Sequence, residues 1–104
     1  MKQIDLDASV WKTDLDVYEA LLRALDAPLG HGRSPDALAD SMIWTDQMNG
    51  VKPPYRVRIV GTRAVAEIVR QEIAVIEEVI RHSRKEYQKR RGRDVEVEIE
   101  TDLG

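Results

Sequence analysis

Hydrophobic and polar residues alternate in three short stretches of the chain, which predicts three β-strands. Residues 3–7 place Ile4 and Leu6 between polar neighbours, residues 55–60 alternate in the same way, and residues 95–100 alternate apolar residues with glutamates. Successive side chains of a strand point to opposite faces, so each stretch has one apolar and one polar face. A parallel sheet that is covered on both faces usually has continuous apolar runs instead. We therefore expect helices to cover mainly one face of this sheet.

Apolar residues recur at intervals of three and four between these stretches, which is typical of helices. Thr13 followed by acidic residues predicts the start of a first helix, and Ala27-Pro28 predicts its end. Ser34 before a proline predicts a second helix, expected to run to about Asn49. The expected buried stripes contain Tyr18, Leu21, Leu22 and Leu25 in the first helix, and Leu38, Met42 and Thr45, flanked by Ser41, Trp44 and Met48, in the second.

The segment 63–91 contains neither proline nor glycine, so the pattern allows one long helix or two helices with a bend. Gly92 is expected to end it, since glycine readily adopts the left-handed conformation at a helix end. The expected stripe contains Val65, Val69, Ile73, Ile76, Ile80, Ser83 and Tyr87, broadened by Ile68, Val75 and Val79. The order strand, helices, strand, helices, strand predicts an α/β fold with a parallel sheet and right-handed crossovers.

Composition adds limits to this picture. The 104 residues suit a single domain spanning 1–104, without cysteine and without an apolar run long enough to span a membrane. The first residues lack the apolar core of a secretory signal, so we expect a cytoplasmic protein. The net charge of −3 is uneven, because residues 1–50 carry −5 and residues 51–104 carry +2. An acidic first half favours a basic partner.

The candidate site is the glycine-rich loop 29–33 and the helix that follows it. Asp36 and Asp40 are four residues apart, so a helix places them on one face, which Ile43 and Gln47 are expected to share. A carboxylate in the first helical turn is also stabilised by the helix dipole, by about 0.3–1 kcal/mol, without any partner. The pattern therefore predicts an exposed acidic face and leaves its purpose open.

Residues 28–40 resemble the second-helix motif of the barstar family, intracellular protein inhibitors of secreted ribonucleases. The matching residues are Pro28, Gly32, Asp36, Ala37, Leu38 and Asp40, and weaker similarity extends over most of the chain. The resemblance implies a barstar-like α/β domain, with a small three-stranded parallel sheet and three to four helices packed mainly on one face. It also implies a cofactor-free inhibitor of a basic ribonuclease or nuclease toxin, whose active site an acidic loop and helix would cover.

Some contact residues of that family are replaced in this chain. The partner-binding residues that the resemblance indicates are His31, Gly32, Arg33, Asp36, Ala39, Asp40, Ile43 and Gln47. Gly30 and His31 stand where barstar has aromatic rings, Ala39 where it has a tryptophan, and Tyr87 where it has an acidic contact. Aromatic anchors carry much of an interface's binding energy, so these replacements indicate a different target enzyme or weaker binding.

Other kinds of site fit the sequence less well. His31 and His82 have no partner at metal-ligand spacing, and the serines form no catalytic triad pattern, so we expect neither a metal nor an enzyme. An alternative function is RNA binding through the basic segment 81–91, although few aromatic residues are available to stack on bases. A third possibility is an adaptor that has lost inhibition.

Overall fold

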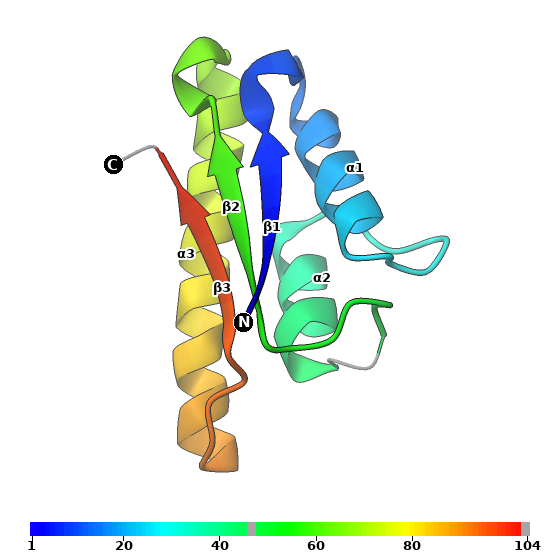
Figure 1. Cartoon of the computed structure of the whole chain (residues 1–104), viewed down its shortest axis with the longest axis vertical. Helices are drawn as coiled ribbons and strands as arrows, with labels where there is room; N and C mark the ends of the chain where they lie inside the picture. Colours follow the sequence, from blue (N-terminus) through cyan, green and yellow to red (C-terminus); the bar gives the residue numbers. More distant parts are fainter. Residues whose placement is uncertain (46–47, 103–104) are drawn as a thin grey trace.

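The computed structural model describes residues 1–45 and 48–102, and its centre is a sheet of three parallel strands (Figure 1). From one edge of the sheet to the other, the strands are β1 (Lys2–Asp7), β2 (Tyr55–Val60) and β3 (Val97–Thr101). The strands pair so that Ile4 lies beside Val57, and Val57 beside Ile99. The predicted small parallel sheet is therefore confirmed, and the structure adds the strand order.

The sheet is buried on one face, as its alternating pattern predicts. In the central strand Tyr55, Val57 and Ile59 are fully buried, whereas Asp5 of β1 and Arg58 of β2 are exposed on the other face. Three helices supply the cover, namely α1 (Asp14–Ala24), α2 (Pro35–Ala39) and α3 (Glu67–Arg91). In Figure 1, α3 runs behind β2 and β3, while α1 and α2 lie on the side of β1.

Helix α1 begins where the sequence predicts. Thr13 is its N-cap, and a capping box forms because Thr13 accepts the Asp16 N–H while the Asp16 carboxylate accepts the Thr13 N–H. The Asp16 carboxylate also accepts the Lys12 N–H, and the two backbone hydrogen bonds from Lys12 and Thr13 lower the Asp16 pKa. Tyr18, Leu21 and Leu25 are buried as expected, Leu22 only partly. The helix ends at Ala24, three residues before the predicted boundary at Ala27.

The segment 63–91 forms a single long helix after a short turn. The 3-10 turns η1 (Ala8–Val10) and η3 (Thr62–Ala64) follow β1 and β2, and α3 then continues unbroken for 25 residues to Gly92, which has a φ of 71°. The expected stripe from Val65 to Tyr87 is buried at all seven positions. Ile68 and Val75 were wrongly assigned to it, because they are 60% and 48% exposed.

The second helix is shorter than predicted and changes its geometry midway. Helix α2 ends at Ala39, and residues 40–44 form a π-helical turn, η2 (Asp40–Trp44), instead of an α-helix that continues to Asn49. Its bond runs from Thr45 N to Asp40 O, five residues back, at 2.6 Å. This wider turn rotates the chain less per residue than an α-helix does. The rotation of each later side chain about the axis therefore differs from that in the predicted helix.

The face assignment of Ile43 was wrong for this reason. Ile43 is 0% exposed and packs in the core with Leu38 and Met42, instead of sharing the exposed face of the aspartates. Thr45 and Met48, which were expected on or beside the buried stripe, are exposed.

Among the described residues, none of the helices has both the length and the apolar character that crossing a membrane requires.

Candidate functional site

The acidic pair lies at the start of the second helix, where the local sequence sets its position. The Ser34 hydroxyl accepts a hydrogen bond from Ala37 N at 3.0 Å, and Pro35 occupies the first helical position. Asp36 follows in the first turn, and Asp40 retains helical backbone angles at the end of α2. Side chains four apart on a helix are neighbours, with about 5–6 Å between their Cβ atoms. The two carboxylates therefore form one negative surface.

Both carboxylates face solvent without an internal partner. Asp36 and Asp40 are exposed, and neither side chain forms an ion pair or a hydrogen bond with another residue in the described part of the chain. The hydrogen bonds at Asp40 involve its backbone: its N–H donates to Asp36 O, and its oxygen accepts from the N–H and the hydroxyl of Thr45. Two charges so placed are available to a cationic partner, as the sequence predicts.

The loop before the helix projects an apolar side chain. His31 N donates to Pro28 O at 3.3 Å across a turn whose third residue, Gly30, has a φ of 81°. This conformation is that of a type II turn, in which glycine is favoured at the third position. Leu29 occupies the tip and is 103% exposed. Figure 1 shows the segment between α1 and α2 extending away from the body of the molecule. Leu29 belongs to the predicted contact loop 29–33 but was not among the residues singled out for partner binding, although the Pro-Leu-Gly turn signal could have indicated it.

His31 fastens this loop to the π-helical turn. Its Nδ1 donates to Gly32 O at 2.7 Å, and its Nε2 is hydrogen-bonded to the Ser41 hydroxyl, also at 2.7 Å. The amide of Asn49 donates to the same Ser41 oxygen at 3.2 Å. Both ring nitrogens of His31 are therefore used within the molecule, and a partner would meet the rest of this half-buried ring.

A shallow hollow of about 330 Å³ lies between the loop and the acidic pair. It is lined by Pro28, Leu29, Gly30, His31, Gly32, Ala37, Asp40 and Met48. Two of the lining residues, Leu29 and Met48, are exposed apolar side chains, and Met48 is 48% exposed. A third lining residue, Asp40, carries a carboxylate. A second hollow, of about 370 Å³, lies on the other side of the loop and is lined in part by Arg33.

The structure brings together only part of the predicted contact set. His31, Gly32 and Asp40 line one hollow, Arg33 lines the other, and Asp36 is exposed nearby. Ala39 is 5% exposed and, like Ile43, belongs to the core. Gln47 lies outside the described residues. Ile43 cannot offer its side chain to a partner in this conformation, because the π-helical turn buries it.

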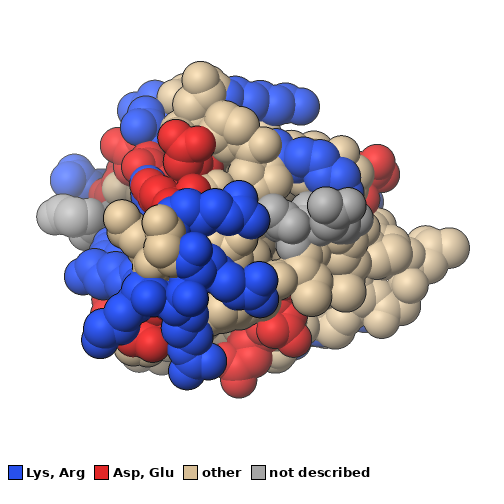
Figure 2. Space-filling view, turned by 90° about the horizontal axis from the view of Figure 1, so that it is seen from below, with Lys and Arg blue, Asp and Glu red and all other residues tan. Residues whose placement is uncertain are grey.

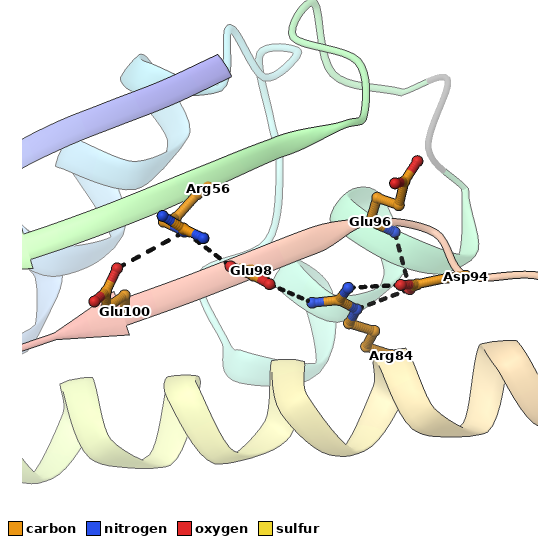
Figure 3. A network of polar contacts seen from close by, with 6 residues as sticks. All are labelled: Arg56, Arg84, Asp94, Glu96, Glu98 and Glu100. Carbon is orange, nitrogen blue, oxygen red and sulfur yellow. Dashed lines mark hydrogen bonds and ion pairs between the residues drawn. The ribbon is translucent and has the colours of Figure 1, made fainter. Parts of the chain in front are cut away.

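A separate polar network at the edge of the sheet joins β3 to α3 (Figure 3). Arg84 donates to both oxygens of Asp94, at 2.8 and 2.6 Å, and to Glu98 at 2.9 Å. The Arg84 guanidinium lowers the pKa of Asp94 to about 2, and Asp94 raises the pKa of Arg84. Arg56 on β2 donates to Glu98 on the neighbouring strand β3 at 2.8 Å. Arg56, Arg84, Asp94 and Glu98 thus each have an oppositely charged partner within the protein.

The geometry offers no site for a metal within residues 1–45 and 48–102, where no three His, Cys, Asp or Glu side chains are grouped so that they could hold an ion.

The comparisons with known proteins agree with an inhibitor. The model of the family described as Barstar (barnase inhibitor) matches residues 1–100. No curated protein matches the chain. The members of the matched family are inhibitors and not enzymes. With its parallel sheet, its capped second helix and a match over nearly its whole length, the chain belongs to the barstar family of ribonuclease inhibitors.

Proposed function

We propose that this protein is an immunity-type inhibitor that binds a ribonuclease or a nuclease toxin in the cytoplasm and covers its basic active site. The observation that carries the proposal is the exposed pair Asp36 and Asp40, which has no internal partner among residues 1–45 and 48–102 and stands beside a projecting loop. An active site that binds RNA presents cations to phosphate groups. Two adjacent carboxylates fit such cations in place of the substrate's backbone.

Electrostatics would supply much of the association rate and of the specificity. Complementary charges steer two proteins together, and this steering weakens as salt rises. When a partner desolvates Asp36 and Asp40, removal of either carboxylate leaves a cation buried without its counter-charge. Such truncations typically cost about 2–5 kcal/mol each.

The loop and its hollow would supply the apolar part of the interface. Leu29 is fully exposed at the tip of its turn, and Met48 borders the same hollow. Interfaces generally combine an apolar centre with a polar rim. Ala39 and Tyr87 replace a large aromatic contact and an acidic contact that the family resemblance implies. We therefore propose that the target nuclease differs from the ribonuclease that barstar inhibits, in the surface that would meet these two positions.

Affinity capture with matched variants tests this function. Immobilised wild-type protein is exposed to extract and culture medium of the source organism, and the eluate is assayed for cleavage of a fluorogenic RNA oligonucleotide. The site variant is D36N/D40N. The control is D5N/E96Q, which removes the same charge from two exposed residues away from the site.

We expect the wild-type protein and the control to capture a ribonuclease that added wild-type protein inhibits. The site variant should lose at least about a thousandfold in affinity, since two losses of about 2 kcal/mol each make about 4 kcal/mol. Full inhibition by D36N/D40N would contradict the proposal. A captured partner without nuclease activity would favour the adaptor function instead.

A further inference from the structure

The end of the molecule at the C-terminus of α3 carries a concentration of positive charge. Residues 81–93 contain seven lysines and arginines and one glutamate, a net of +6 in a chain whose total is −3. Figure 2, which views the molecule from this end, shows these side chains gathered over the helix terminus. We call Lys89, Arg90, Arg91 and Arg93 the basic pole.

Ion pairs neutralise Arg81 and Arg84, which precede this pole on α3, but not most of the pole itself. Arg81 pairs with Glu77 and Glu78, and Arg84 is held by Asp94 and Glu98. Lys89, Arg91 and Arg93 form no ion pair with any carboxylate in the described part of the chain. Arg90 has one long contact with Glu86, at 3.9 Å, and its side chain is 71% exposed. The pole therefore keeps most of its charge for a ligand.

Three of these guanidinium groups lie on aromatic rings. Trp44 and Tyr87 are in contact, with 5.5 Å between their ring centroids. Arg90 lies 5.7 Å from the Trp44 centroid, and Arg91 and Arg93 each lie 5.6 Å from that of Tyr87. Stacking of this kind restrains an arginine while leaving its N–H donors available. Tyr87 is itself 3% exposed, so its ring cannot serve as a stacking platform for bases.

The helix dipole accounts for only part of this cluster. Cations are favourable in the last turn of a helix, and the effect falls off beyond it. Arg93 lies past Gly92, after the helix has ended, and yet it returns to the Tyr87 ring. A second function of this surface would explain its placement better than helix stabilisation alone.

The surroundings of the pole indicate the kind of ligand. Protein interfaces usually have an apolar core, whereas nucleic acids present a regular line of phosphates that cations neutralise. The large exposed apolar residues of the described chain are Met1, Val10, Leu15, Leu29, Met48, Ile68 and Val75, and none of them is one of the aromatic residues that the pole contacts. Guanidinium groups match phosphates with two parallel hydrogen bonds. An acidic protein surface therefore fits this pole less well than a phosphate backbone.

We propose that the basic pole binds the phosphate backbone of RNA without regard to base sequence, independently of nuclease inhibition. Binding is measured by fluorescence anisotropy with a labelled single-stranded RNA of 20 nucleotides and mixed sequence. The pole variant is R91E/R93E. The control, K12E/R63E, changes the net charge equally at two exposed residues beside η1 and η3, at the far end of α3. Circular dichroism checks that each variant is folded.

The wild-type protein is expected to bind with a dissociation constant of about 10⁻⁴–10⁻⁶ M. Each phosphate contact contributes about −0.7 to the slope of log K against log salt, so four contacts give about −3. We expect R91E/R93E to bind at least about tenfold more weakly with a flatter slope, and K12E/R63E to stay within about twofold of wild type.

Three results would overturn the assignment. One is an absence of RNA binding by the wild-type protein at low salt, and another is an equal loss in both variants, which would indicate an effect of net charge alone. The third is equally tight binding of polyglutamate of the same charge, which would indicate an acidic protein partner. Because inhibition is assigned to Asp36 and Asp40, each of these results leaves the proposed function untouched.

Discussion

Arg84 joins the long helix to the edge strand, and its replacement by methionine is expected to destabilise the fold measurably. The change R84M keeps an apolar stem of similar length and removes the guanidinium. Three charge-assisted hydrogen bonds are lost, two to Asp94 and one to Glu98. Glu98 keeps its bond from Arg56 at 2.8 Å. Asp94 therefore loses both of its hydrogen bonds from an arginine, whereas Glu98 loses one and keeps one.

The expected loss follows from the pKa of Asp94. Arg84 helps to lower it from 3.8 to about 2. One pKa unit corresponds to 1.36 kcal/mol, so the whole shift corresponds to about 2.4 kcal/mol. Solvent screens part of this energy, because the side chains of Arg84 and Asp94 are 26% and 34% exposed. With the lost bond to Glu98 added, R84M should lower the free energy of unfolding by about 2 kcal/mol, or the melting temperature by about 8 °C.

Urea and thermal unfolding followed by circular dichroism at pH 7 measure this loss. R81M is the matched control, since Arg81 lies on the same helix, is 53% exposed and, within the described part of the chain, pairs only with Glu77 and Glu78 one turn before it. It should cost no more than about 0.5 kcal/mol. In R84M/D94N the unpaired carboxylate is gone, and part of the stability should return.

Equal losses in R84M and R81M would refute the reasoning. They would mean that solvent screens the Arg84 pairs as completely as it screens ordinary surface ion pairs. A double variant R84M/D94N less stable than R84M would also contradict it, because the harm would then come from lost packing and not from an unpaired charge.

Three further predictions concern single residues. Because the folded-state pKa of Asp94 is about 2, below its ordinary 3.8, its contribution is present above pH 4 and should be lost as the pH falls from about 4 to 2; acid unfolding of D94N should show a smaller change over that range. I43A should cost about 2–4 kcal/mol in urea unfolding, because Ile43 is fully buried. G92A should cost about 1 kcal/mol, purely through its φ of 71°, since a methyl group there meets nothing within 4 Å; a melting temperature equal to that of wild type would contradict this.

The elements that local patterns specify agree closely with the structure. Tyr55–Val60 forms a strand with the predicted bounds, because strict alternation suits only a half-buried strand. The stripe from Val69 to Tyr87 is buried because its spacing repeats that of a helix. The exposed pair Asp36 and Asp40 also follows from spacing alone, since residues four apart share a helical face.

Only the tertiary structure decided the features that depend on distant residues or on a change of helical geometry. A wide turn after Ala39 buries Ile43, although an ideal helix would have exposed it. The hydrogen bond between His31 and Ser41 and the cation–π contact of Arg90 with Trp44 join segments that no helical or strand repeat connects. The sequence by itself therefore determined the strands, the buried stripe of the third helical region and the acidic pair, because each repeats a short-range period, whereas only the structure showed that this region forms one unbroken helix. Packing decided the shape of the loop, the burial of Ile43 and the basic pole, because these depend on which segments meet in space.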